Sequence, residues 1–312
     1  MPIDVIIREV GPRDGLQLVK KFMNTDTKLD WITQQVRTGF KEIEVTSFVP
    51  PKLMPQFSDA EEVIHASNNL SRFTASALAV NLKGGVRALQ AGTSVVNFVL
   101  SASESHSQSN ARISTEAAIQ VCYELIDWQK QNAPNSKIAV AIATSFGCPL
   151  QGTVDEYQVS KIAAQLAEAG PAEITLADTV GYANPRQVKR IFKAVAAEVQ
   201  DVPLVAHFHD TRGLGLANVV AALDSGVQKF DASLAGLGGC PFAPGASGNI
   251  ATEDTVNMCE TMGLRTGIDL YALMQLRKRF SLWLPDEALE GRMIKAGISS
   301  TFTQTRSRVH SI

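Results

Sequence analysis

The sequence predicts an α/β protein, a closed (β/α)8 TIM barrel with a C-terminal helical appendage. The first observation is an alternation: short runs rich in β-branched and apolar residues are followed by longer amphipathic segments, eight times in succession. The second is length, because the eight units occupy about 260 residues, the usual size of such a barrel. A doubly wound open sheet would give the same alternation and is the alternative, since the alternation does not by itself show that the sheet closes.

The predicted strands are short runs rich in residues that favour strands. They are residues 5–8, 42–47, 73–78, 95–100, 138–144, 173–177, 204–208 and 229–235. The predicted helices are recognised by their stop and start signals: Gly39 follows one, Gly92 another, and Pro185 opens a third. These helices are residues 27–38, 59–66, 82–91, 115–131, 154–169 and 185–199.

The alternation ends near Gly267. Residues 268–284 have a helical pattern, whereas residues 285–312 have little pattern of any kind. We therefore expect a catalytic barrel domain over residues 1–266 and an appendage over residues 267–312 that caps the barrel or joins subunits. Such an appendage favours a homo-oligomer, a dimer or a tetramer.

Composition excludes several classes of protein. The chain is 45% hydrophobic and 19% charged, as expected for a globular enzyme, and its formal net charge is −2. Without a long basic block no nucleic-acid partner is expected, and no apolar run approaches membrane-spanning length. The four cysteines lie far apart, which argues against a zinc cluster or a disulfide framework. Because the N-terminal segment also lacks the features of a signal peptide, we expect a cytoplasmic enzyme.

Two histidines close the predicted strand at residues 204–208. His207 and His209 are two positions apart, so they point to the same face of an extended chain. Imidazoles side by side at the end of a buried strand are a suitable pair of metal ligands. The alternative is one structural histidine beside one solvated neighbour.

Other unusual residues also fall at strand ends, where TIM barrels carry their chemistry. Arg13 and Asp14 follow the first strand, and Glu44 lies within the second. A buried carboxylate is costly unless it is paired, which makes Arg13 the expected partner of Glu44. Asp178 follows the sixth strand, and Cys240 follows the eighth among glycines that would leave its thiol exposed. The structural alternatives are a turn at Arg13 and Asp14 and a helix cap at Asp178.

These parts can be combined into a metal site. Asp14 would supply a carboxylate oxygen, His207 and His209 two nitrogens, and Asn249 an amide oxygen. A mixed oxygen and nitrogen set without thiolate suits Mg²⁺ or Mn²⁺ and would leave open positions for substrate oxygens.

Five motifs strongly resemble the 3-hydroxy-3-methylglutaryl-CoA lyase family, over about residues 3 to 265. They are Glu9-Val10-Gly11-Pro12-Arg13-Asp14-Gly15-Leu16-Gln17, Thr46-Ser47-Phe48-Val49, His207-x-His209-Asp210-Thr211, Gly236-Leu237-Gly238-Gly239-Cys240-Pro241 and Gly245-Ala246-Ser247-Gly248-Asn249-x-Ala251-Thr252-Glu253-Asp254. The resemblance implies a TIM-barrel lyase that uses a divalent metal ion in a retro-aldol reaction. Its substrate would be 3-hydroxy-3-methylglutaryl-CoA or a related 3-hydroxyacyl-CoA, cleaved to acetyl-CoA and a ketoacid such as acetoacetate. This is the chemistry of leucine degradation and ketone-body formation.

The resemblance also implies roles for individual residues. The family's metal ligands are matched by Asp14, His207, His209 and Asn249. Arg13 matches the arginine that stabilises the enolate, and Glu44 matches the carboxylate that supports this arginine. Cys240 matches the cysteine that transfers a proton, and the residues next to the substrate are matched by Gln17 and Asp178. The base that removes the hydroxyl proton would be Asp14 or His207.

Departures from the family pattern keep other functions open. Leu18 and Arg212 differ from the usual residues near the expected pocket mouth, so a different hydroxyacyl-CoA is an alternative substrate. A condensing acyltransferase of the isopropylmalate or citramalate synthase type would use the same barrel and metal. A catalytically silent barrel that serves as a binding module is the alternative from a different class.

Overall fold

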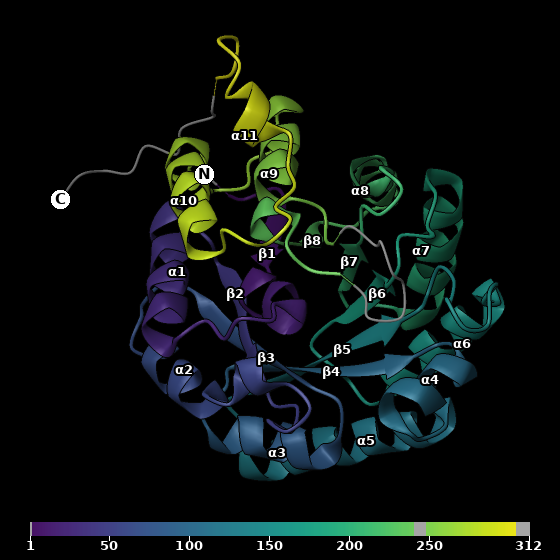
Figure 1. The fold of residues 1–312 in the computed structure, drawn as a ribbon. Coiled ribbons are helices and arrows are strands. Elements are labelled where there is room, and N and C mark those ends of the chain that lie inside the picture. Colours follow the sequence, from purple (N-terminus) through teal and green to yellow (C-terminus); the bar gives the residue numbers. More distant parts are fainter. Residues whose placement is uncertain (1, 240–247, 304–312) are drawn as a thin grey trace.

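The computed structural model describes residues 2–239 and 248–303, and its centre is a closed barrel of eight parallel strands (Figure 1). The strands pair in chain order, and β1 pairs with β8 to close the ring. They are β1 (Ile6–Glu9), β2 (Glu42–Ser47), β3 (Thr74–Ala79), β4 (Val95–Ser101), β5 (Lys137–Ala143), β6 (Ile174–Asp178), β7 (Leu204–Phe208) and β8 (Lys229–Ala232). The predicted TIM barrel is confirmed, and the open-sheet alternative is wrong because no edge strand remains between β1 and β8.

Helices surround the barrel on its outside, as Figure 1 shows. They are α1 (Thr25–Thr38), α2 (Ala60–Ser67), α3 (Leu82–Gln90), α4 (Glu104–Ala111), α5 (Thr115–Asn132), α6 (Glu156–Glu168), α7 (Pro185–Val199), α8 (Gly215–Leu223), α9 (Thr252–Thr261), α10 (Leu270–Trp283) and α11 (Met293–Ala296). The signals read from the sequence act where expected: α1 ends at Gly39 with a φ of 113°, and α7 begins at Pro185 after an Asn184 cap. Among the described residues, no helix is long and apolar enough to cross a membrane.

The predicted appendage is packed against the barrel rather than held apart from it. On α10, Phe280 is fully buried and its ring centroid lies 4.5 Å from that of Trp31 on α1. Leu273 of α10 belongs to the same apolar core as the barrel strands. In Figure 1, α10 lies beside α1 and α9. The helical part of the appendage is therefore confirmed, whereas a domain boundary at residue 266 stays a prediction.

Candidate active site

The residues predicted to hold a metal ion converge at the C-terminal ends of the strands. Asp14 lies in a short π-helical turn, Gly11–Gly15, which follows β1. His207 lies in β7, and His209 follows that strand. The candidate ligand atoms of these three buried residues all lie within 4.8 Å of one another. Asn249 is brought to the same place by an antiparallel bridge to His209. Segments far apart in the sequence thus form one cluster.

Arg13 is held rigidly beside this cluster. Its Nε donates to Oε2 of Glu44 at 2.5 Å, and its Nη1 donates to Oδ1 of Asp14 at 2.6 Å. Glu44 is itself held from β4, because Nδ2 of Asn97 donates to its other oxygen at 3.1 Å. The pairing of Arg13 with Glu44 is as the sequence predicts. Within the described residues Nη2 of Arg13 has no hydrogen-bond partner, so this nitrogen is available to a substrate oxygen.

Neighbouring groups favour the ionised form of Asp14, and one of them, Asn249, keeps an oxygen without a partner in the described part of the chain. Burial alone would raise its pKa, but the Arg13 guanidinium and the two imidazoles hold the pKa of Asp14 well below its ordinary value. Its Oδ2 accepts from Nδ2 of Asn249 at 2.6 Å and lies 3.7 Å from Nε2 of His209. This contact turns the amide so that Oδ1 of Asn249 is buried without a partner in the described part of the chain. A buried acceptor without a donor costs about 1–3 kcal/mol, which favours a ligand there.

His207 contacts a buried carboxylate, Asp231, that was not among the predicted site residues. Its Nδ1 lies 3.1 Å from Oδ2 of Asp231, and Oδ1 of Asp231 accepts from Nε of Arg8 at 2.7 Å. Burial would lower the pKa of His207, but the hydrogen bond and charge of Asp231 raise it. The available signal was a charged residue inside each of two buried strands, Arg8 in β1 and Asp231 in β8.

The remaining predicted residues have different surroundings. Gln17 lines the cavity next to the cluster. Asp178 does not line it: the side chain is fully buried and accepts from the backbone N–H groups of Tyr182 and Ala183 at 2.8 and 3.0 Å. That geometry favours the structural alternative of a loop cap, so a substrate contact for Asp178 stays a prediction. Cys240 lies outside the described residues.

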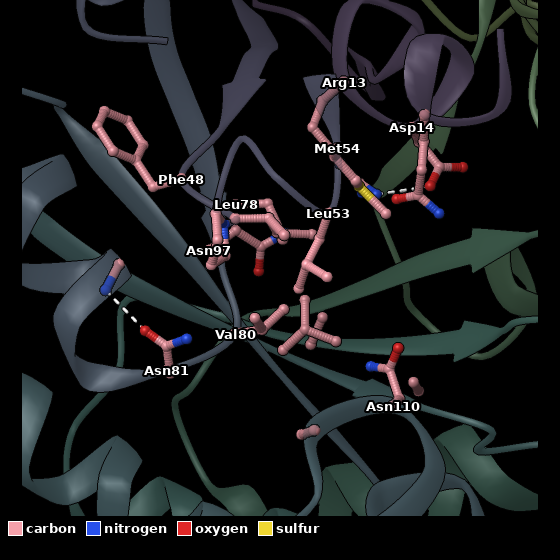
Figure 2. A pocket seen from close by; sticks show the side chains of 18 of the residues that line it. Arg13, Asp14, Phe48, Leu53, Met54, Leu78, Val80, Asn81, Asn97 and Asn110 are labelled. Carbon is pink, nitrogen blue, oxygen red and sulfur yellow. Dashed lines mark hydrogen bonds and ion pairs between the residues drawn. The ribbon is translucent and has the colours of Figure 1, made fainter. Parts of the chain in front are cut away.

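A cavity of about 1260 Å³ opens from the cluster toward the ends of β3 and β4. Figure 2 shows Arg13 and Asp14 at one side, Asn81 and Asn110 at the other, and Leu53 and Met54 between them. Its wall also contains basic side chains at residues that lie away from the cluster, namely Lys52, Lys83, Arg87 and Arg112. The cavity therefore joins an ionic centre to an apolar passage with cations beyond it.

The two ends of the segment that carries Cys240 lie against each other. A Cβ placed on Gly248 would stand 2.4 Å from the carbonyl oxygen of Gly236 and 2.6 Å from that of Gly238. Gly238 has a φ of 136°, a region that favours glycine. The chain therefore leaves the site at Gly238 and returns at Gly248 in direct contact.

A closed barrel with a carboxylate–imidazole cluster and a fixed guanidinium at its catalytic end defines a barrel enzyme with a site suited to a divalent cation. The HMGL-like family matches residues 4–279, and the chain belongs to this family. It is therefore a carbon–carbon lyase, as its relatives show.

The chain is similar to curated proteins along most of its length. It is 42% identical to the hydroxymethylglutaryl-CoA lyase YngG of Bacillus subtilis over 278 residues, which cover 89% of this chain and 92% of the relative. It is 38% identical to a 3-hydroxy-3-isohexenylglutaryl-CoA/hydroxymethylglutaryl-CoA lyase of Pseudomonas aeruginosa, covering 89% and 92%. Among solved structures it resembles an HMG-CoA lyase from Acinetobacter baumannii in complex with coenzyme A and 3-methylmalate. The TM-score is 0.90 at 42% identity, covering 97% of this chain and 98% of that one.

Proposed function

We propose that this chain cleaves 3-hydroxy-3-methylglutaryl-CoA into acetyl-CoA and acetoacetate in a retro-aldol reaction that depends on a divalent metal ion. The observation that carries the proposal is the fixed Arg13 guanidinium, with Nη2 available, directly beside a buried carboxylate and two imidazoles in one cavity. The names of the relatives from B. subtilis and A. baumannii support the choice of substrate.

The metal ion would be held by Asp14, His207, His209 and Oδ1 of Asn249. The fit rests on the donor set and on the unpartnered Oδ1 of Asn249, which is an acceptor that a cation would satisfy. Oxygen and nitrogen donors without thiolate favour Mg²⁺ or Mn²⁺. When bound, such an ion would polarise the tertiary hydroxyl of the substrate and lower its pKa.

The chain's own residues would carry out the rest of the reaction. Of the two bases predicted from the sequence, Asp14 would take the hydroxyl proton, because Nε2 of His207 would bind the metal ion and its Nδ1 faces Asp231. As that proton leaves, the C2–C3 bond breaks and its electron pair becomes the enolate of acetyl-CoA, while C3 becomes the ketone of acetoacetate. Nη2 of Arg13 would stabilise the enolate oxygen, with Glu44 and Asn97 fixing the guanidinium. The thiol of Cys240 would then return a proton to C2.

Coenzyme A would occupy the outer part of the cavity. Leu53, Met54 and Val80 would contact the pantetheine chain, and the basic residues beyond them would contact the phosphates. Arg87 is well placed, because it stacks on Phe48 with its guanidinium carbon 5.5 Å from the ring centroid.

A larger acyl group is a second candidate substrate. Ala177 is paired in register with His207, and Ala141 and Ala143 of the next strand also line the cavity. Small side chains next to a metal ligand leave room for a substituent longer than methyl, as in the substrate named for the P. aeruginosa relative. A lyase of this kind would cleave other 3-hydroxy-3-alkylglutaryl-CoA thioesters by the same steps.

The test is a panel of 3-hydroxyacyl-CoA thioesters assayed for acetyl-CoA and ketoacid with Mg²⁺, with Mn²⁺ and with EDTA. We expect cleavage of 3-hydroxy-3-methylglutaryl-CoA that EDTA abolishes. Release of free CoA from acetyl-CoA and a 2-oxoacid would favour the condensing acyltransferase instead. If the protein binds Mn²⁺ but cleaves none of the thioesters, the binding module becomes the favoured function.

Two further expectations remain proposals. We propose a homo-oligomer, for which the exposed Tyr271 and Leu282 of α10 offer apolar surface, and light scattering on purified protein tests it. A cytoplasmic location, tested by fractionation of cells, also stays a proposal.

A further inference from the structure

A row of hydrogen-bonded side chains leads from His207 into the barrel. Arg8 of β1 and His207 of β7 are both paired in register with Asp231 of β8, so all three side chains share the inner face of the sheet. Nε of Arg8 donates to Oδ1 of Asp231 at 2.7 Å, and Nδ1 of His207 lies 3.1 Å from Oδ2. Arg8 and Asp231 are each 2% exposed, so water does not compete for these contacts.

This contact decides which nitrogen of His207 is free. Oδ2 of Asp231 can only accept, so Nδ1 of His207 carries a proton and Nε2 keeps its lone pair for a metal ion. His209 differs, because its buried Nδ1 has no partner within the described residues. We infer that Asp231 is a positioning residue that fixes the metal-binding tautomer of His207, and that Arg8 holds Asp231 in the orientation this requires. The inference rests on the metal site of the proposed function.

Arg8 is itself fixed from the base of the barrel. Its Nη1 donates to Glu173, and Glu173 also accepts from Nζ of Lys229 at 2.6 Å. Lys229 in turn donates to Glu42 at 2.7 Å. Charges of opposite sign alternate along this row, from β8 and β1 through Glu173, which precedes β6, to β2. The guanidinium therefore cannot turn away from Asp231 without leaving a buried charge unpaired. The row is therefore anchored at the end opposite to the metal site.

The decisive variant is Asp231→Asn, which keeps the size of the side chain but adds donors. Nε–H of Arg8 still needs an acceptor, so the amide oxygen must face Arg8 and the amide NH₂ must face His207. His207 would then accept at Nδ1 and carry its proton on Nε2, the nitrogen that faces the metal. We expect the Mn²⁺ dissociation constant to rise about 10- to 100-fold, the range found for residues that orient metal ligands. Nitrogen NMR of metal-free protein, above the pKa of the imidazole, should show the proton of His207 moved from Nδ1 to Nε2.

A charge-balanced double variant, R8M/D231N, is the matched control. Without the guanidinium, the amide of Asn is free to turn its oxygen toward His207, and Glu173 keeps Lys229 as its partner. We expect the Nδ1–H tautomer to return and Mn²⁺ affinity to approach that of the wild type. In a His207→Ala background, Asp231→Asn should cause no further loss of affinity, because the side chain through which it acts is gone.

Several results would overturn the inference. One is an Asp231→Asn protein that binds Mn²⁺ as the wild type does; another is an equal loss of affinity in the His207→Ala background. If Asp231→Asn does not fold, an Nε2–H tautomer in R8M/D231N decides against the inference and an Nδ1–H tautomer decides for it. Failure of the wild type to bind Mn²⁺ would refute the metal site as well. Because Mn²⁺ binding is measured without substrate, failure to cleave 3-hydroxy-3-methylglutaryl-CoA is a separate result.

Discussion

Replacing Arg13 with Gln is the most direct test of how the site would stabilise the enolate. Nε of the guanidinium donates to Glu44 and Nη1 donates to Asp14, so Nη2 remains available for the reaction. Loss of a preorganised donor to a developing oxyanion costs about 2.7–4 kcal/mol of transition-state stabilisation, a factor of about 10² to 10³ in turnover. We expect the kcat of Arg13→Gln to fall by this amount.

The variant will also be less stable, and that effect must be separated from catalysis. Removing one partner of a buried ion pair costs about 3–5 kcal/mol, here because Glu44 would keep only Asn97 as a donor. The double variant R13Q/E44Q removes the unpaired charge, so it should regain stability in urea unfolding but not turnover.

Metal affinity gives an independent check on Arg13→Gln. Removing a cation beside the cluster should leave Mn²⁺ binding unchanged or tighter, since Arg13 repels the ion. Turnover of Arg13→Gln within tenfold of the wild type, at saturating Mn²⁺, would remove Arg13 from the proposed role.

Three further predictions concern the metal, the proton donor and the fold. His209→Ala should weaken Mn²⁺ binding by about 100-fold or more, measured by competition with a chelator, and an unchanged dissociation constant counts against ligation. Cys240→Ser should lower kcat by about 10² without changing the melting temperature, and full activity excludes proton transfer by this thiol. Burial raises the pKa of Glu9 from 4.5 to about 7 although three groups donate to it. A pKa raised in the folded state means that this carboxyl stabilises the fold fully below about pH 4.5 and loses that contribution, at most about 3 kcal/mol, as the pH rises through about 7. Glu9→Gln cannot ionise, so its unfolding free energy should fall less than that of the wild type between about pH 5 and pH 8; parallel curves would show that Glu9 is ionised throughout.

Much of the barrel could be predicted because most of its strands have a recognisable local sequence pattern. Residues 42–47 and 204–208 have the predicted bounds. The first segment alternates polar and apolar residues, and the second is a short apolar run. The last strand is shorter than predicted: β8 ends at Ala232, because Ala235 and Gly236 take left-handed conformations with φ of 66° and 59°. That turn depends on tertiary contacts, such as the hydrogen bond from the N–H of Ala235 to buried Glu253, which no local pattern encodes.

Helices without an amphipathic pattern were missed. α4 is polar on all sides, and α8 is apolar on nearly all sides and begins with Gly215, so neither has the 3.6-residue alternation that predicts a surface helix. Both are stabilised by the neighbours they pack against rather than by their own sequence.

The candidate site also contains residues that could be predicted from the sequence and residues that could not. Residues that stand at strand ends, such as Asp14 and His209, could be found from the sequence because the barrel brings all strand ends together. Arg8 and Asp231 could be noticed as charged residues inside buried strands, but their contact with each other and with His207 could not be predicted, because it depends on the register between β1, β7 and β8. Asp178 also stands at a strand end, but strand alternation turns it away from the cavity that Ala177 lines, so its contact with substrate stays a prediction.

The contact between Gly238 and Gly248 has a consequence for how such an enzyme can change. Gly238 and Gly248, which flank the intervening segment, are already in contact. The free-energy cost of closing a loop grows slowly with its length, by about 0.6 kcal/mol for each doubling, so a change in the length of this segment would have little effect on the stability of the fold. Evolution or design could therefore change the length of the segment that carries residue 240 while the barrel keeps its stability.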